Sequence, residues 1–231
     1  LLMLGILREV GSDQVQLHRL IATYVASELS AEEVAAGETA VSTQTIQSLA
    51  AQFNQTRFLG NLPIKPAHLQ WMVQRGLARG DELGTQLPLW WGRYLRDVGS
   101  LEAAIAVLET AVSARRALQI ECDLILADLL NLLGTLMWET GSLNKAWSMY
   151  EEVLTIRRAA VGENHTLTAQ ALQNLAILHR QTGSLATAKT YYEQALVIYE
   201  QLSPPDELHI SLTSFNLGFL LKNMNLFSES E

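Results

Sequence analysis

The chain has 231 residues, of which 48% are hydrophobic and 17% are charged, and its formal net charge is −8. This composition is too apolar for a disordered chain and supplies enough apolar side chains for a sizeable core. The acidic balance argues against binding to nucleic acid by broad neutralisation of phosphates, which requires an excess of Lys and Arg.

The cysteine count and the hydropathy exclude two further classes of protein. Cys122 is the only cysteine, so an intramolecular disulfide is impossible. We expect a reducing, cytoplasmic setting, with Cys122 buried as a packing residue. No apolar run approaches the roughly 20 residues that span a bilayer, so we expect no membrane partner. Because the first residue is Leu1 rather than Met, we expect the chain to be part of a longer polypeptide.

Residues 1–30 have a pattern that differs from the rest of the chain. Residues 6–10 and 14–17 are predicted as short strands on either side of a tight turn at Gly11, Ser12 and Asp13. Residues 18–29, which begin at His18, are predicted as a helix. A hairpin followed by a helix indicates the end of a winged-helix domain over residues 1–30.

Residues 31–82 are predicted to link this segment to the C-terminal part of the chain. Residues 31–42 are rich in Ala, Glu and small polar residues, which indicates a linker or a short exposed helix. Residues 43–58 and 67–78 have amphipathic spacing, which predicts two helices joined around Pro63 and Pro66.

Residues 83–231 repeat with a period of 42 residues, in about three and a half copies. The tripeptide Gly-Ser-Leu begins at Gly99, Gly141 and Gly183, and in the fourth copy, which starts near Leu212, Asn225 replaces the turn glycine. Small residues recur at the same step: Gly92, Gly134, Ala176 and Gly218, and also Ala104, Ala146 and Ala188.

Each copy is predicted to form two antiparallel helices. In the third copy, Leu172, Leu175 and Ala176 lie on one helical stripe, and Ala188 and Tyr192 lie on the next. A glycine between them ends the first helix. One such pair cannot bury both of its faces, so neighbouring pairs must stack. The predicted fold class is therefore all-α, a right-handed helical-hairpin solenoid.

These residues resemble the tetratricopeptide repeat, whose 34-residue pattern contains W-x2-L-G-x2-Y. The 42-residue step is similar to the longer repeats of kinesin light chains and their bacterial relatives. The resemblance covers residues 83–231 and implies a module that binds a protein or peptide. In the second copy the matching residues are Leu130, Leu133, Gly134, Gly141, Ala146, Tyr150 and Val153.

The segment before the repeats resembles a second family. Residues 15–25, VQLHRLIATYV, are similar to the winged-helix end of STAND-class signalling ATPases with an NB-ARC core. That family has a Met-His-Asp motif here, whose histidine approaches bound ADP. His18 matches the histidine, whereas Arg19 replaces the acid. The resemblance implies that His18 contacts nucleotide together with an upstream nucleotide-binding domain in cis; otherwise His18 begins and caps a helix.

Motifs for catalysis or metal binding are absent from the sequence. It has neither a GxxxxGKS/T phosphate loop nor HExxH, and its His and Cys residues lack metal-ligand spacing. We therefore expect no enzyme activity, cofactor or metal in this chain.

The remaining charged and histidine residues are expected to have structural roles. We expect His179 to pack in the core and His165 to cap or brace a loop. We expect the doublets Arg115–Arg116 and Arg157–Arg158 to serve helix dipoles and solubility, and Glu151–Glu152 to be solvated.

The tetratricopeptide resemblance implies that the first helices of the pairs line a concave peptide-binding groove. Asn and Gln offer a donor and an acceptor together and can bind a peptide backbone. We expect Asn174 and Asn216 to stack along the groove, and Arg180 and Lys222 to attract an acidic group. The groove positions are Asp128, Asn131, Thr135 and Trp138, then Gln170, Gln173, Asn174, Ile177 and Arg180, then Phe215, Asn216, Phe219 and Lys222.

Three functions are compatible with these patterns. The first is the ligand-sensing and autoinhibitory C-terminal region of a STAND-type ATPase. The second is a free-standing adaptor of the kinesin light chain type, and the third is a transcription regulator that uses a winged helix. In each, the incomplete last repeat is expected to expose an apolar face around Leu217, Leu220 and Leu221, so that the chain self-associates or a further helix covers that face.

Overall fold

The computed structural model describes residues 30–56, 58–59, 65–202 and 204–228. The chain divides into two compact units, residues 1–48 and residues 49–231. The described residues of the first unit belong almost entirely to the N-terminal part of one helix. The predicted hairpin, the predicted helix at 18–29 and His18 lie outside the described residues, so the winged-helix domain and the nucleotide contact stay predictions.

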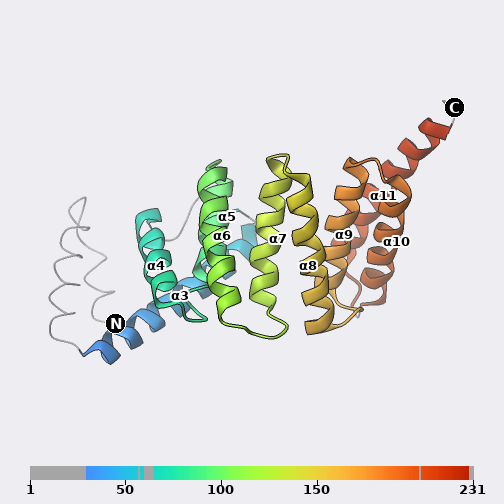
Figure 1. Cartoon of the computed structure of the whole chain (residues 1–231). Helices are drawn as coiled ribbons and strands as arrows, with labels where there is room; N and C mark the ends of the chain where they lie inside the picture. The colour runs from blue at the N-terminus through green and yellow to red at the C-terminus, as the bar shows by residue number, and fades with distance from the viewer. Residues whose placement is uncertain (1–29, 57, 60–64, 203, 229–231) are drawn as a thin grey trace. The chain divides into compact units, whose positions relative to one another are not determined.

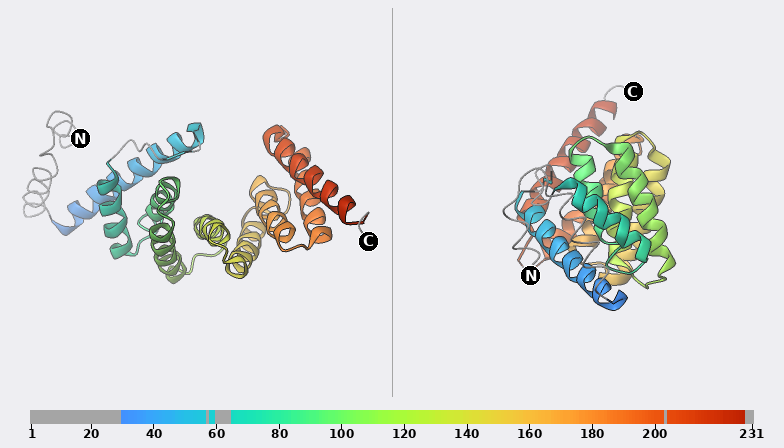
Figure 2. Two further views of the ribbon diagram at one scale, coloured as in Figure 1. Left: turned by 90° about the horizontal axis from the view of Figure 1, so that it is seen from above. Right: turned by 90° about the vertical axis from the view of Figure 1, so that its left-hand side faces the viewer.

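The second unit is built from antiparallel helix pairs (Figure 1). All regular elements of the described residues are α-helices. Within residues 49–231, α5, α7, α9 and α11 form one layer and α6, α8 and α10 form the other, as Figure 2 shows from above. This confirms the expected all-α helical-hairpin solenoid. The helices are α3 (Ala31–Thr56), α4 (Pro66–Arg79), α5 (Leu87–Asp97), α6 (Leu101–Ala117), α7 (Leu124–Glu139), α8 (Leu143–Val161), α9 (Thr166–Gln181), α10 (Leu185–Gln201) and α11 (Glu207–Ser228).

The Gly-Ser-Leu tripeptide ends the first helix of each pair in the same way. Gly99, Gly141 and Gly183 each have φ of 81°, which is the left-handed region that favours glycine. After α7, the Ser142 amide donates to the Met137 carbonyl at 2.7 Å. Gly141 donates to the Trp138 carbonyl at 3.1 Å. Together these bonds form the Schellman motif, so the period of the sequence becomes the period of the helix pairs.

Small residues lie where the two helices of a pair approach each other. A Cβ on Gly134 would lie 2.9 Å from Cε1 of Tyr150, which is closer than packed carbons approach. Ala176 occupies the same repeat position and packs beside Tyr192 in a buried cluster. At Gly218, the fourth such position, nothing in the described residues lies within 4 Å of an added Cβ. This face of α11 therefore has no second helix against it in the described chain.

A buried ion pair joins α6 to the start of α7. Nε of Arg115 lies 2.5 Å from Oδ2 of Asp123, and these side chains are 2% and 3% exposed. Asp123 also caps α7 by accepting from two backbone amides, and Arg115 donates to the Glu82 carbonyl at 2.9 Å and to Thr85 Oγ1 at 3.0 Å. The pair is thus fully hydrogen-bonded, as burial of two charges requires.

Arg157 occupies the equivalent position one period later, with a different acidic partner. It is also buried, and it donates to the Leu167 carbonyl at 3.0 Å and to Asp128 Oδ1 at 2.9 Å. The expectation that both arginine doublets serve only solubility and helix dipoles is therefore wrong for Arg115 and Arg157. The second arginines, Arg116 and Arg158, are exposed and pair with Glu152 and Glu163 at 2.6 Å and 2.9 Å.

Three further expectations are corrected by the helix boundaries and the burial. Residues 31–42 form neither a linker nor a separate short helix, because α3 continues without a break to Thr56. α11 passes through Asn225, where no glycine is available to reverse the chain. Leu220 is buried against Ala188 and Tyr192 of α10, so it is not part of an exposed face, whereas Leu217 is half-buried and Leu221 is 37% exposed.

Candidate protein-binding surface

The first helices of the pairs present one set of repeat positions on the inner layer. On α7 and α9 the predicted groove residues are all half-buried, whereas on α11 most of them are exposed. The equivalent positions, in the order α7, α9 and α11, are Asp128, Gln170 and Leu212; Asn131, Gln173 and Phe215; Leu132, Asn174 and Asn216; Thr135, Ile177 and Phe219; and Trp138, Arg180 and Lys222.

Between α7 and α9, polar side chains on this face bond to one another across the repeats. Nδ2 of Asn174 donates to Oδ1 of Asn131 at 2.7 Å. Nε1 of Trp138 donates to Oε1 of Gln181. Asn174 is therefore engaged with α7, and no bond to Asn216 is present among the described residues. These bonds therefore occupy some of the polar groups that were predicted to bind a ligand.

The second helices supply further partners to the same face. Oδ1 of Asp128 accepts from Arg157, and Oε1 of Gln173 accepts from the Tyr199 hydroxyl at 3.3 Å. Burial raises the pKa of Tyr199, and Asp206 raises it further. The phenol therefore stays protonated and remains a donor to Gln173. Thus Asp128 and Gln173 join the two helices of their own pairs, whereas Asn131 and Trp138 bond across the repeats.

Four of the predicted residues keep their binding capacity. Gln170, Asn216 and Lys222 form no hydrogen bond or ion pair within the described part of the chain. The guanidinium of Arg180 lies 5.5 Å from the centroid of the Phe219 ring, an attractive cation–π contact that leaves its charge without an acidic partner among the described residues. These four side chains are the ones that a bound segment could still engage.

The last helix adds an apolar stripe that the sequence pattern predicted only in part. Leu208, Leu212, Phe215 and Phe219 are 62%, 48%, 73% and 48% exposed, and we call them the α11 seam. The two phenylalanines were predicted to lie in the groove, whereas both leucines were missed. The sequence feature that could have identified these leucines is the 4-3-4 spacing of apolar residues on a helix that already has another apolar face.

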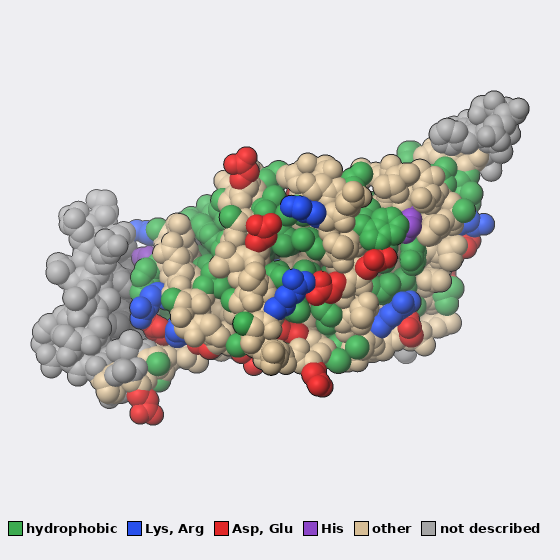
Figure 3. Space-filling model, in the orientation of Figure 1, with side chains coloured by type: hydrophobic (Ala, Val, Ile, Leu, Met, Phe, Trp, Pro, Cys, Tyr) green, Lys and Arg blue, Asp and Glu red, His purple; other side chains and the backbone are tan. Residues whose placement is uncertain are grey.

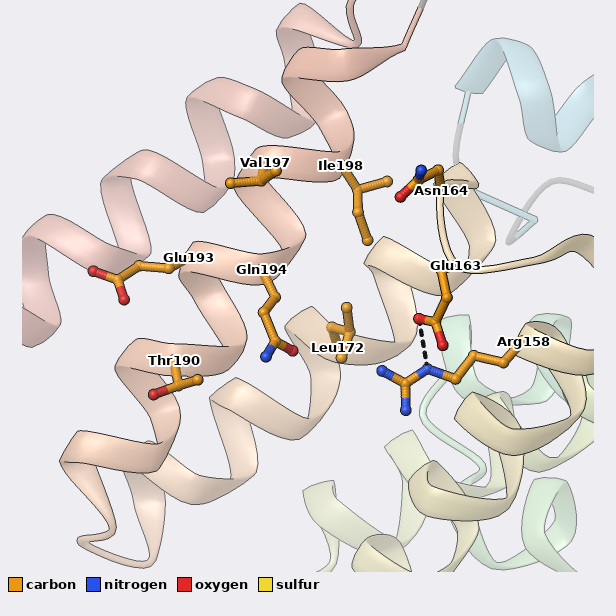
Figure 4. Close-up of a pocket in the computed structure, with 9 residues that line it drawn as sticks. All are labelled: Arg158, Glu163, Asn164, Leu172, Thr190, Glu193, Gln194, Val197 and Ile198. Atoms are coloured by element: carbon orange, nitrogen blue, oxygen red, sulfur yellow. Dashed lines mark hydrogen bonds and ion pairs between the residues drawn. The ribbon is translucent and has the colours of Figure 1, made fainter.

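The outer layer carries a shallow depression of about 460 Å³ (Figure 4). Arg158 and Glu163, which pair at 2.9 Å, lie across it from Gln194 and Ile198 of α10. Glu193 also has a partner, Lys189, at 3.6 Å. Its charged groups are thus compensated locally, and the depression offers no converging set of groups for chemistry.

Charges on the outer face are mixed rather than segregated. Figure 3 shows basic and acidic side chains lying next to one another across this face. Arg116–Glu152 and Arg158–Glu163 are two such pairs. Part of the doublet Glu151–Glu152 is thus engaged in an ion pair. Among the described residues of this face, no extended basic surface of the kind that binds nucleic acid is visible.

His179 and His165 both have the packing or capping contacts that the sequence predicted for them. His179 is buried against Trp147 and Tyr191, with ring centroids 4.2 Å and 5.3 Å away, which confirms core packing. Burial lowers the pKa of His179, and Glu151 opposes that shift in part. Nδ1 of His165 accepts from the Leu167 amide at 3.1 Å, which confirms its predicted capping role.

Cys122 is exposed in the loop between α6 and α7, so the expectation of a buried thiol is wrong. Its φ of 51° lies in the left-handed region, and the residue is part of a turn. Within the described ranges, no three His, Cys, Asp or Glu residues gather as a metal site would require. Among the helices that the structure describes, none has the length and apolarity needed to cross a bilayer.

Comparisons with known proteins agree with this architecture. Residues 125–201 match the tetratricopeptide repeat family model. No curated protein sequence matches the chain. The fold is similar to BtubC (BKLC) from P. vanneervenii, with a TM-score of 0.65 and 19% identity over 87% of each chain. It is also similar to the nearly identical TPR-like repeats of a putative kinesin light chain from Podosopora anserina, with a TM-score of 0.60 and 13% identity over 84% of this chain and 88% of that one.

At these identities the structural likenesses establish the fold alone. The family match covers residues 125–201 and the described helices have a tetratricopeptide-like solenoid fold; such repeats generally serve as protein–protein interaction modules.

Proposed function

We propose that the chain is a protein-binding module whose binding surface is the inner face of α7, α9 and α11. The observation that carries this proposal is the change in exposure along that face. At three repeated positions the side chains are half-buried on α7 and α9 and become exposed and apolar on α11, where they are Leu212, Phe215 and Phe219. An apolar surface of this kind beside unpaired amide and cationic groups is typical of a site that receives another polypeptide.

The available polar groups indicate how a bound segment would be oriented. Gln170 and Asn216 each offer a donor and an acceptor to a peptide backbone. Arg180 and Lys222 occupy equivalent positions one repeat apart and would attract an acidic group of the ligand. The apolar side chains of the α11 seam would supply most of the buried area, because burial of apolar surface is the main favourable contribution in such contacts.

Two settings for this module are compatible with the chain. The sensor of a STAND-type ATPase is favoured by the hairpin-and-helix pattern of residues 1–30, with His18 facing a nucleotide-binding domain in cis. An adaptor of the kinesin light chain type is favoured by the two similar structures, one named BKLC and one a putative kinesin light chain. The full-length reading frame separates them: the sensor requires a phosphate-binding loop about 200 to 300 residues upstream, given typical domain sizes.

Peptide-array binding to the 231-residue chain tests the proposed surface. We expect Gln170→Ala/Asn216→Ala to weaken binding of selected peptides at least about tenfold, because each lost hydrogen bond contributes on the order of 1 kcal/mol. Neither side chain has a partner within the described residues, so thermal stability should not change. Gln194→Ala on the outer face of α10 is the matched control. Equal binding by the parent and the double variant would place the site elsewhere.

A further inference from the structure

The apolar character of the α11 seam is specific to this helix among the first helices that the structure describes. A following helix of a repeat would cover the face that holds Gly218, because Gly134 meets Tyr150 of the next helix there. The seam lies on the inner face, where the equivalent residues of α9 are half-buried rather than fully covered although α10 and α11 follow it. At the equivalent positions α9 has Thr166, Gln170, Gln173 and Ile177, of which three are polar.

The seam has the spacing of a helix-to-helix interface. Leu208, Leu212, Phe215 and Phe219 follow one another at steps of four, three and four residues, the interval at which side chains interdigitate between two helices. The opposite side of α11 is already buried, with Thr213 and Leu220 fully covered. A helix that is apolar on both sides is normally buried on both sides.

We propose that the seam is covered by α11 of a second copy of this chain, packed antiparallel in a two-fold symmetric dimer. In that register Leu208 meets Phe219 of the partner subunit, and Leu212 meets Phe215 of the partner subunit. Both contacts occur twice by symmetry, so all four seam residues find an apolar partner. This inference rests on the proposed inner-face surface and names an occupant for its α11 end.

Charge supports the antiparallel orientation. Glu207 lies at the start of the seam and Lys222 lies just beyond its end, and neither forms an ion pair within the described residues. In the antiparallel register each Lys222 comes within about one helical turn of Glu207 of the partner subunit. A parallel pair would instead place Glu207 near Glu207 and Lys222 near Lys222. Charges that flank an apolar seam commonly set the orientation of paired helices in this way.

The size of the seam predicts a weak, reversible dimer. Its four exposed side chains amount to roughly 400 Å² per copy, given about 150–250 Å² for each aromatic residue. Stable interfaces bury about 800 Å² per partner. We therefore expect a dissociation constant in the micromolar range, on the order of tens of micromolar, rather than a permanent assembly.

Sedimentation velocity over a wide concentration series tests the dimer with the whole 231-residue chain. The parent should shift from monomer to dimer as concentration rises. Phe215→Gln/Phe219→Thr introduces the residues that α9 and α7 carry at these positions and should weaken association at least about tenfold, with unchanged helicity. Val197→Thr, which changes an equally exposed apolar residue on α10, should associate like the parent. A parent that stays monomeric at every concentration overturns the proposal, as does association that survives the double phenylalanine variant.

Charge exchange tests the orientation. Glu207→Lys and Lys222→Glu should each weaken the dimer severalfold, and the combination should restore it. Failure of the combination to restore association excludes the antiparallel register. A monomeric parent whose seam residues are nevertheless needed for peptide binding assigns the seam to a different partner and overturns the second-copy proposal. If Gln170→Ala/Asn216→Ala loses peptide binding but still dimerises, the peptide-binding proposal and the dimer proposal are tested separately, because different residues carry them.

Discussion

Between α7 and α9 the inner face is closed by hydrogen bonds from one repeat to the next, whereas between α9 and α11 the equivalent positions carry none among the described residues. Asn131 bonds to Asn174, but their counterparts one period later, Gln173 and Asn216, do not pair. The repeat position thus fixes where a side chain points. The residue type decides whether the surface is used internally or remains available to a partner.

The largest effect should come from the buried ion pair of the interior repeats. Asp123→Ala leaves Arg115 charged, buried and without its main partner, which should cost about 3–5 kcal/mol of unfolding free energy. Glu152→Ala removes the acid of the exposed Arg116 pair and should cost less than about 1 kcal/mol. Urea denaturation of both variants measures the two values. Similar losses of unfolding free energy in the two variants would contradict the expectation that the buried pair contributes more than the exposed pair.

The next effect compares the same glycine position in two helices. Gly134→Ala introduces a Cβ against Tyr150, and the overpacking should outweigh the gain in helix propensity, for a net loss of about 1 kcal/mol. Gly218→Ala meets no atom of the described chain and should stabilise α11 by about 0.5–1 kcal/mol. The two changes should therefore shift the melting temperature in opposite directions. A shift of the same sign would mean that position 218 is packed in solution.

The smallest effect is a dependence of stability on pH that distinguishes α9 from its neighbours. His179 stands where α7 has Met137 and α11 has Leu221. Burial lowers the pKa of His179 in the folded state, so the unfolded chain binds a proton first as pH falls below about 6.5. Stability should fall between that pH and the lower folded pKa. The drop in melting temperature between pH 7.5 and pH 5.5 should be smaller in His179→Met than in the parent; an identical drop would contradict this role.

Much of the fold could be predicted from the sequence because its determinants are local. The Gly-Ser-Leu turns and the small residues at helix contacts recur at one fixed step, and each has a direct conformational reason. Burial was harder to predict, because it depends on which helix packs over a residue. Arg115 was expected at the surface and is buried by the loop before α5, while Cys122 was expected inside and lies in an exposed turn.

The candidate site could be predicted only as a set of positions. The repeat pattern placed Asn131, Asn174 and Trp138 on one face, but their mutual bonds depend on distances between helices that no sequence spacing reveals. Leu208 and Leu212 were missed because the groove positions assigned on the last helix began only at Phe215. The 4-3-4 spacing that joins them to Phe215 and Phe219 was present in the sequence.

Hydrogen exchange of the unmodified chain at low and high concentration tests the difference between the two ends of the inner face most directly. Residues 208–222 of α11 should gain protection as concentration rises, while α7, whose inner face is internally bonded, should stay unchanged. Protection that does not depend on concentration, or a gain that appears on α7 or the outer helices instead, would contradict the account.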